Sequence, residues 1–295
     1  MIDSRIFVVG CVRSGTTLLQ SMLHAHPQIY SLPETKFFDC LIGIDSRAFL
    51  RLQPRALKSR IRALARDWLV RAGVVDSRRQ YHAWRRMRQF VTNSGIAIPA
   101  ESTSYLISRQ AQGFVTLMDR LTLAAHKSMW LEKTPDHLFY IKHIARYVPR
   151  ARFIHIVRNG KDNVASLYDN ARKYPGPSWG HYDTVEMAVR RWRVALEETL
   201  KYQNDEAHYI VRYEELALNP TKTLEDICAF LGCRFDQKMI SEQEEAASSL
   251  IEPQETWKSG SRKRLAGVSP SKFYELFDAE QRAYIEAAVG KRQPG

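Results

Sequence analysis

The chain of 295 residues is long enough to bury the core of one large domain. With 44% hydrophobic and 26% charged residues, its composition is that of a globular protein and excludes a collagen-like or wholly disordered chain. Lys and Arg number 44 against 32 Asp and Glu, and the formal net charge of +12 predicts a polyanionic partner or, more simply, a generally basic surface.

A strand, a tight turn and a helix are expected at the start of the chain. Residues 6–9 are a continuous apolar run, typical of a parallel strand that is buried on both faces. Apolar residues then recur at helical spacing from Thr16 until Pro27, which disfavours helix in the residue before it. A second strand is expected at residues 28–31, followed by a loop at 32–36.

The next part of the chain is helical in pattern and strongly basic. Twelve Lys or Arg residues lie from Arg51 to Arg88, with two aspartates among them, and helices are expected over about 54–90 and 109–126. We expect residues of about 40–128 to form a helical, basic insertion or lid. Aromatic side chains among the arginines fit an acidic or aromatic acceptor, although an amphipathic helix with a solvated arginine face gives the same pattern.

The rest of the chain alternates strands with helices. Strands are expected at residues 129–132, 152–157 and 208–211, and helices at 136–147, 161–171, 184–202 and 221–231. This alternation predicts an α/β fold, a three-layer sandwich with a mostly parallel central sheet. No low-complexity linker divides the chain, so residues 1–295 are expected to form a single domain.

The four cysteines are Cys11, Cys40, Cys228 and Cys233, with no CxxC pair and no histidine at metal-ligand spacing. We therefore expect neither a zinc site nor a disulfide framework, and no bound metal. Thiols of this kind suit a reducing compartment. The apolar run at the start of the chain is too short for a signal peptide, and no later run reaches membrane-spanning length, so the expected location is cytoplasmic.

A glycine-rich loop from Gly10 to Thr17 follows the first strand with the spacing GxxxxG. Backbone N–H groups in such a P-loop-type turn, together with the start of the next helix, converge on an anion. A triphosphatase needs lysine directly after the second glycine to reach the β- and γ-phosphates, but that position is Thr16. Arg13 supplies a cation within the loop instead. The loop therefore indicates a phosphate-like anion and disfavours magnesium-dependent ATP chemistry.

Three separated motifs make the chain resemble the sulfotransferase superfamily that uses 3′-phosphoadenosine-5′-phosphosulfate (PAPS). The stretch of residues 5–38 is most similar to the protein-tyrosine sulfotransferase branch and related bacterial enzymes. The motifs span residues 13–18 (RSGTTL), 158–166 (RNGKDNVAS) and 212–216 (RYEEL). The resemblance implies transfer of a sulfuryl group to an acceptor hydroxyl, with 3′-phosphoadenosine-5′-phosphate (PAP) as product.

The resemblance also implies roles for individual residues. The first motif would bind the 5′-phosphosulfate through Arg13, Ser14, Gly15, Thr16 and Thr17. Arg158 and Ser166 would bind the 3′-phosphate, and the third motif adds Tyr213 to the cofactor site. A basic loop late in the chain, similar in character to one that covers the nucleotide in the family, suggests Ser261, Arg262 and Lys263.

The catalytic group implied by the resemblance consists of Glu34, Lys133 and Arg13. Glu34 resembles the general base of the protein-tyrosine branch, and His137 is the alternative base. Lys133, just past a strand, resembles the lysine that contacts the leaving phosphate, so that Arg13 and Lys133 would bracket the sulfuryl group. Arginine, lysine and backbone donors can stabilise the growing charge without a metal.

Two other classes of function are weighed against this one. The first is a nucleotide kinase or triphosphatase on the same loop, and the second is a basic protein that binds nucleic acid. The acceptor, which the sequence does not identify, could be a small molecule, a glycan or a peptide of acidic or aromatic character. A homodimer is left open.

Overall fold

The structure is a computed structural model that describes residues 1–43, 68–92, 94–176, 179–252, 255 and 271–290. Ser261, Arg262 and Lys263 lie outside the described residues, as does the first part of the basic segment, 51–67. In the described ranges, no helix combines the length and the apolar character needed to cross a bilayer.

Five parallel strands form one sheet in the order β2-β3-β1-β4-β5. The expected α/β class and parallel sheet are confirmed, with each strand within a few residues of the range expected from sequence. The strands are β1 (Ser4–Gly10), β2 (Ile29–Ser31), β3 (Met129–Lys133), β4 (Ala151–Val157) and β5 (His208–Arg212).

β1 is the central strand and is buried on both faces, as its apolar run predicts. Successive side chains of a strand point to opposite faces. Ile6 and Val8 therefore join one hydrophobic cluster, while Phe7 and Val9 join the other. The two clusters are the two interfaces of a three-layer sandwich.

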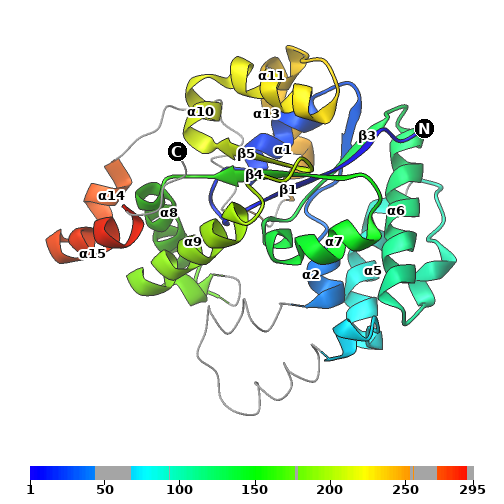
Figure 1. Cartoon of the computed structure of the whole chain (residues 1–295), viewed down its shortest axis with the longest axis horizontal. Coiled ribbons are helices and arrows are strands. Elements are labelled where there is room, and N and C mark those ends of the chain that lie inside the picture. Colours follow the sequence, from blue (N-terminus) through cyan, green and yellow to red (C-terminus); the bar gives the residue numbers. More distant parts are fainter. Residues whose placement is uncertain (44–67, 93, 177–178, 253–254, 256–270, 291–295) are drawn as a thin grey trace.

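Helices cover both faces of the sheet (Figure 1). One layer consists of α1 (Thr16–His24), α10 (Tyr213–Leu218), α11 (Pro220–Leu231), α12 (Lys238–Ser241) and α13 (Gln243–Leu250). The opposite layer consists of α2 (Phe37–Ile42), α5 (Ser77–Val91), α6 (Ile107–Ala124), α7 (Ile141–Tyr147), α8 (Gly160–Lys173) and α9 (Val185–Leu200). The last two helices, α14 (Ser271–Leu276) and α15 (Ala279–Val289), pack on α8 and α9.

The helix expected over residues 136–147 is the clearest departure from the sequence pattern. The chain first forms a 3₁₀ helix, η2 (Pro135–Tyr140), and only then α7. The backbone N–H of His137 donates to the carbonyl oxygen of Thr134, 2.9 Å away. The hydrogen bond therefore spans three residues, as in a 3₁₀ helix, where an α-helix would span four. This tight turn brings the His137 ring back over β3, where it meets Glu132. Shorter 3₁₀ helices are η1 (Ala100–Thr103) and η3 (Gly180–Tyr182).

Helix α5 is the described part of the basic segment. It buries Trp84 against the ring of Phe37 and turns Arg78, Arg85 and Arg88 to solvent. Its other arginines point inward, and the Nε of Arg86 donates to a backbone carbonyl in the loop after β2. Helix α5 therefore joins the hydrophobic core on this face of the sheet. An insertion or lid formed by residues of about 40–128 stays a prediction.

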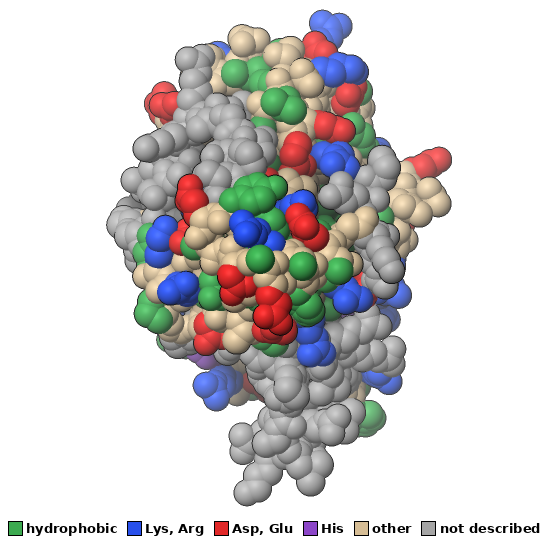
Figure 2. All heavy atoms as spheres, turned by 90° about the vertical axis from the view of Figure 1, so that its left-hand side faces the viewer, with side chains coloured by type: hydrophobic (Ala, Val, Ile, Leu, Met, Phe, Trp, Pro, Cys, Tyr) green, Lys and Arg blue, Asp and Glu red, His purple; other side chains and the backbone are tan. Residues whose placement is uncertain are grey.

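At least one face of the molecule carries, where the structure describes it, a mixture of acidic and basic side chains in place of a basic patch. Figure 2 shows the side that includes α14 and α15, where acidic and basic side chains are interspersed among the described residues. Several of them pair directly: Lys161 with Glu286 at 2.7 Å, and Lys272 with Asp169 at 2.7 Å. This face therefore lacks, in its described part, the basic stripe that nucleic acid binding requires.

Two histidines on the neighbouring strands β4 and β5 should make the stability of the protein depend on pH. His155 is buried on β4, and its Nε2 lies 2.8 Å from Nδ1 of His208 on β5. Burial and the neighbouring His208 lower the pKa of His155 from 6.5 to about 3. The unfolded chain therefore binds a proton below pH 6.5 that the native protein excludes, and the free energy of unfolding should fall by up to about 1.4 kcal/mol per pH unit from there toward pH 3.

Urea titrations between pH 7.5 and 5 check this prediction. His155→Gln should flatten the pH dependence, whereas the control His82→Gln, at an exposed site on α5, should leave it as in the wild type. An identical slope in wild type and His155→Gln would assign the acid sensitivity to other groups.

Candidate functional site

The register of the sheet brings the sequence motifs to one edge. β1 pairs with β3 up to Val8 opposite Lys133, and with β4 up to Gly10 opposite Ile156. Because all strands run in parallel, the residues that follow them meet at the carboxyl edge, where open α/β sheets bind their ligands.

The predicted site residues follow the strand order along that edge. Glu34 comes after β2, Lys133 ends β3, the glycine loop follows β1, Arg158 follows β4, and Tyr213 follows β5. Neighbouring strands lie about 4.8 Å apart. The edge thus places a carboxylate and a lysine on one side of the loop, and an arginine with a tyrosine on the other.

Two glycines let the loop approach its neighbours closely. A Cβ on Gly10 would lie 2.4 Å from the carbonyl oxygen of Ile156, and one on Gly15 would lie 2.4 Å from Cδ2 of Tyr213. Gly15 is also the N-cap of α1, in the left-handed backbone at φ 100°. It has no side chain to cap the helix, so the first N–H groups of α1, including those of Thr16 and Thr17, are oriented to bind an anion.

Substitution of Gly15 should therefore be costly. We expect Gly15→Ala to lower the free energy of unfolding by about 1–3 kcal/mol more than Gly73→Ala, because only Gly15 faces a ring. Gly73 is a matched control: it has a similar positive φ, 76°, and a Cβ there would meet none of the described atoms within 4 Å. Urea denaturation measures the free energy of unfolding of both variants. Equal losses in the two variants would show that the Tyr213 ring moves aside without loss of stability.

Ser14 shapes the loop from within. Its hydroxyl donates to the carbonyl oxygen of Cys11 at 2.6 Å, and its backbone N–H lies 3.2 Å from the same oxygen. The Cys11 thiol in turn donates to Oδ1 of Asn163 on α8 at 3.3 Å. Both donors of Ser14 are thus used to hold the turn, and the loop is anchored to the helix that carries Ser166.

Arg13, Ser166 and Arg158 form a basic cluster beside the loop. Arg13, with a left-handed backbone at φ 71°, donates from Nε to Oγ of Ser166 at 3.2 Å. Nη1 of Arg158 lies 3.4 Å from the carbonyl oxygen of Arg13, and its guanidinium stacks on the Tyr213 ring at 4.7 Å. Burial and the charge of Arg158 lower the pKa of Arg13. An anion bound to both guanidinium groups would relieve this repulsion.

The cluster is suited to bind a phosphate-like anion. Nε of Arg158 is buried without a hydrogen-bond partner in the described part of the chain, whereas buried donors are normally satisfied. Ser166 lies on α8 within reach of the same space, as the eight-residue spacing of the motif implies. The resemblance implies that Arg13 contacts the sulfuryl end of the donor; in the structure its Nε donates to Ser166, and the role at the sulfuryl group stays a prediction.

Two residues that the sequence pattern did not single out hold this cluster. Oε1 of Glu214 accepts hydrogen bonds from the backbone N and the Nδ2 of Asn159, at 2.9 and 3.0 Å. The indole of Trp192 donates to the carbonyl oxygen of Arg158 at 2.9 Å. Glu214 lies in a motif that was recognised, next to Tyr213, whereas nothing in the local pattern marks Trp192.

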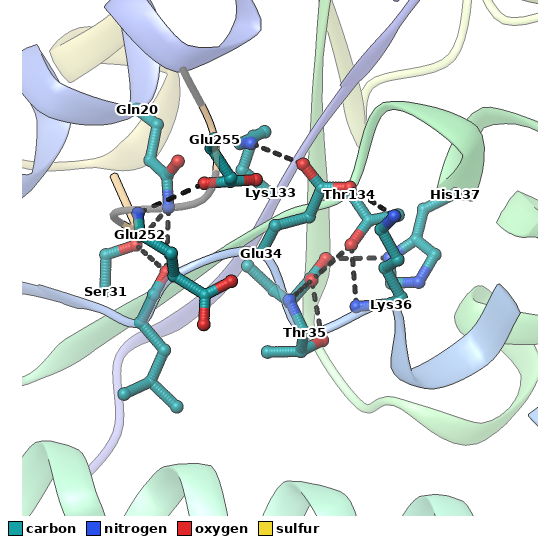
Figure 3. A network of polar contacts seen from close by, with 12 residues as sticks. Gln20, Ser31, Glu34, Thr35, Lys36, Lys133, Thr134, His137, Glu252 and Glu255 are labelled. Atoms are coloured by element: carbon teal, nitrogen blue, oxygen red, sulfur yellow. Dashed lines mark hydrogen bonds and ion pairs between the residues drawn. The ribbon is translucent and has the colours of Figure 1, made fainter. Parts of the chain in front are cut away.

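At the other side of the loop, Glu34 lies between two lysines (Figure 3). Its Oε2 is 2.8 Å from Nζ of Lys133, and its Oε1 is 3.8 Å from Nζ of Lys36. The Lys133 side chain is only 1% exposed, while that of Glu34 is 11% exposed. Arg86 of α5 fixes the backbone here, because its Nε donates to the carbonyl oxygen of Glu34 at 2.6 Å. The carboxylate is thus held in place and still reaches the surface.

His137 lies in a different environment, beneath this edge. It is fully buried against Phe38, and its Nδ1 is 2.7 Å from Oε2 of Glu132, off the line of a straight hydrogen bond. Burial alone would raise the pKa of Glu132, but His137 and the hydroxyls of Thr35 and Thr134 outweigh it and lower that pKa. The His137–Glu132 pair is a core contact, whereas the Glu34 carboxylate is partly exposed.

Comparison with known proteins agrees with this geometry. Residues 5–237 match the family described as "Sulfotransferase family". The chain is 25% identical to protein-tyrosine sulfotransferase 1 of Danio rerio, covering 81% of this chain and 56% of that protein. It is 24% identical to the protein-tyrosine sulfotransferase of Drosophila melanogaster, covering 81% and 40%. The chain thus spans about half the length of these curated relatives.

Solved structures share the fold. The sulfotransferase domain of the Synechococcus PCC 7002 olefin synthase aligns with a TM-score of 0.59 at 19% identity, covering 99% of this chain and 96% of that one. Mouse sulfotransferase SULT7A1, solved in complex with PAP, aligns with a TM-score of 0.53 at 13% identity, covering 99% and 85%. Since the family match covers most of its length, the chain belongs to the sulfotransferase family.

Proposed function

We propose that this protein transfers a sulfuryl group from PAPS to an acceptor hydroxyl. One observation carries the proposal: the Glu34–Lys133 pair and the Arg13–Ser166–Arg158 cluster lie on opposite sides of one glycine loop, at one sheet edge. A donor with a 5′-phosphosulfate and a 3′-phosphate needs two anion sites. A hydroxyl acceptor needs a base on the sulfuryl side.

Each part of the edge has a distinct task in this reaction. The N–H groups at the start of α1 would hold the 5′-phosphosulfate, while Arg158 and Ser166 would hold the 3′-phosphate. The Glu34 carboxylate would accept the proton of the acceptor hydroxyl while the oxygen of that hydroxyl bonds to sulfur. Lys133 would stabilise the negative charge that grows on the 5′-phosphate as the bond from that phosphate to the sulfuryl group breaks and PAP leaves.

The acceptor we propose is a phenolic hydroxyl on an acidic peptide. The curated relatives named above are protein-tyrosine sulfotransferases. The exposed ammonium of Lys36 lies 3.8 Å from Glu34, so the base has a cation at its rim that suits acidic residues beside a tyrosine. If a glycan or a small phenol is labelled and the peptide is not, the assignment of the acceptor is wrong, but the assignment of the transfer reaction stands.

A titration and a transfer assay test the proposal. Calorimetry should show PAP binding in the micromolar range, and PAPS labelled at sulfur should label a tyrosine peptide flanked by acidic residues. Absence of PAP binding would overturn the donor assignment. Hydrolysis of ATP with magnesium would favour the triphosphatase alternative, and salt-sensitive DNA binding that PAP does not displace would favour the nucleic-acid alternative.

Other expectations stay predictions. Ser261, Arg262 and Lys263 lie outside the described residues, so their contact with the nucleotide depends on substitution experiments. A cytoplasmic location, a homodimer and the lack of a metal requirement are likewise proposals, to be checked by fractionation, sedimentation and turnover in the presence of a chelator.

A further inference from the structure

Two cysteines meet at the end of α11. Gly232 takes the left-handed conformation, φ 80°, and ends the helix. The N–H of Cys233 then donates to the carbonyl oxygen of Cys228 at 2.9 Å, and the N–H of Gly232 to that of Ala229 at 3.2 Å. These two bonds define a Schellman motif, in which the side chains three residues before the cap and two after it contact each other. The motif therefore places one thiol beside the other.

A histidine from a distant part of the chain completes the cluster. The two sulfur atoms and a ring nitrogen of His26 all lie within 4.8 Å of one another. His26 follows the end of α1, while Cys228 and Cys233 belong to the neighbouring α11 and the residues after it. Because α1 begins at the glycine loop and is nine residues long, the cluster lies about 14 Å along the helix from the anion site.

The two thiols have different environments. Cys228 is 1% exposed, with its Sγ 3.7 Å from the Sδ of Met239, whereas Cys233 is partly exposed. A hydrogen bond from the Cys228 thiol lowers the pKa of Cys233, burial opposes this, and a hydrogen bond from His26 adds to the lowering. The pKa of Cys228 is raised by the same pairing and by burial. Cys233 is therefore the nucleophile of the pair, and Cys228 is the buried thiol that can attack the Cys233 sulfur afterwards.

The hydrogen bonds of His26 argue against a metal at this place. Its Nδ1 accepts a bond from the backbone N–H of Gln28 at 3.1 Å, so the proton is on Nε2, which lies 2.9 Å from the carbonyl oxygen of Arg234. A metal on Nε2 would require the proton on Nδ1, where the N–H of Gln28 already points. The Nε2–H donates to the carbonyl oxygen of Arg234, and a ring nitrogen of His26 lies within 4.8 Å of both sulfur atoms.

We propose that Cys233 and Cys228 are a thiol–disulfide exchange site that reacts with low-molecular-weight disulfides such as oxidised glutathione. The Cys233 thiolate attacks one sulfur of the disulfide, whose S–S bond breaks to release one glutathione thiolate, which takes up a proton. Cys228 then loses its proton and attacks the Cys233 sulfur, releasing the second glutathione. The products are a Cys228–Cys233 disulfide and two reduced glutathione molecules.

Alkylation rates test the nucleophile. In the full chain at pH 7, iodoacetamide should label Cys233 at least about tenfold faster than Cys40. Cys40 is a matched control, since it is also partly exposed but burial raises its pKa. His26→Gln should move the pH of half-maximal labelling of Cys233 upward. Equal labelling rates at Cys233 and Cys40 would overturn the proposal, and so would reactivity that emerges only after a chelator removes a metal.

Oxidised glutathione tests the second step. Mass spectrometry of unreduced digests should show a Cys228–Cys233 cross-link in the wild type, and the link should disappear with dithiothreitol. Cys228→Ser should stop at a glutathione adduct on Cys233, and Cys233→Ser should give neither product at this site. A wild type that accumulates the adduct without closing the disulfide would contradict the assignment of Cys228. PAP binding by the reduced protein provides an independent check of folding in each variant.

Discussion

Glu34→Gln is expected to lower the turnover number of sulfuryl transfer by about 10²- to 10⁴-fold, while the affinity for PAP changes by less than about threefold. Glutamine has nearly the same shape, and its amide oxygen can still accept the hydrogen bond from Lys133, which lies 2.8 Å from Oε2 in the wild type. It cannot accept the proton of the acceptor. Turnover with the labelled donor and calorimetry with PAP measure the two quantities.

Two further variants keep this test sharp. Glu225→Gln, on the exposed side of α11, is the matched control and should leave turnover unchanged. Loss of the charged partner of buried Lys133 can also weaken folding, so a thermal melt accompanies each variant. Glu34→Asp keeps the ion pair but draws the carboxylate back, and it should retain the fold with reduced turnover. Wild-type turnover in Glu34→Gln would remove Glu34 as the base.

Arg158→Ala is expected to weaken PAP binding by about 10- to 150-fold, the loss of a charge-assisted hydrogen bond to a phosphate. The guanidinium stacks on Tyr213, and its Nε has no partner among the described residues, so the side chain is oriented toward an anion before the ligand arrives. Arg158→Lys should give an intermediate affinity, because lysine keeps the charge but cannot stack or offer two parallel donors.

Arg152→Ala is the control for this variant. Arg152 lies at the other end of the same strand, where it covers the ring of Phe230 at 5.0 Å and reaches the carbonyl oxygen of Glu206. Its removal changes the net charge by the same amount, so it separates local contact from general attraction. Equal loss of PAP affinity in both variants would show that the 3′-phosphate is not bound at Arg158.

The class of fold followed from the pattern of apolar residues along the chain, and the glycine spacing predicted an anion loop at Gly10 to Thr17. The apolar run at 6–9 predicted a strand buried on both faces, because only a central parallel strand accommodates such a run, and β1 is that strand. The spacing of Gly10 and Gly15 predicted an anion-binding loop, and Thr16 at the position where a triphosphatase needs lysine disfavoured ATP as the ligand. These conclusions depend on residues close in sequence, where spacing and backbone conformation are directly linked.

The order of the strands and the packing of the helices determine which distant side chains meet. Glu34 and Lys133 are 99 residues apart and pair because β2 lies beside β3 in the sheet. His137, which a local pattern could equally assign to the site, is drawn into the core by Glu132 through a 3₁₀ turn.

Cys228 and Cys233 lack the CxxC spacing of known redox motifs, yet a helix cap brings them together, and His26, which follows α1, reaches them because the residues after α1 lie beside the end of α11. Periodicity determines which elements form. The order of strands and the packing of helices determine which side chains share a site.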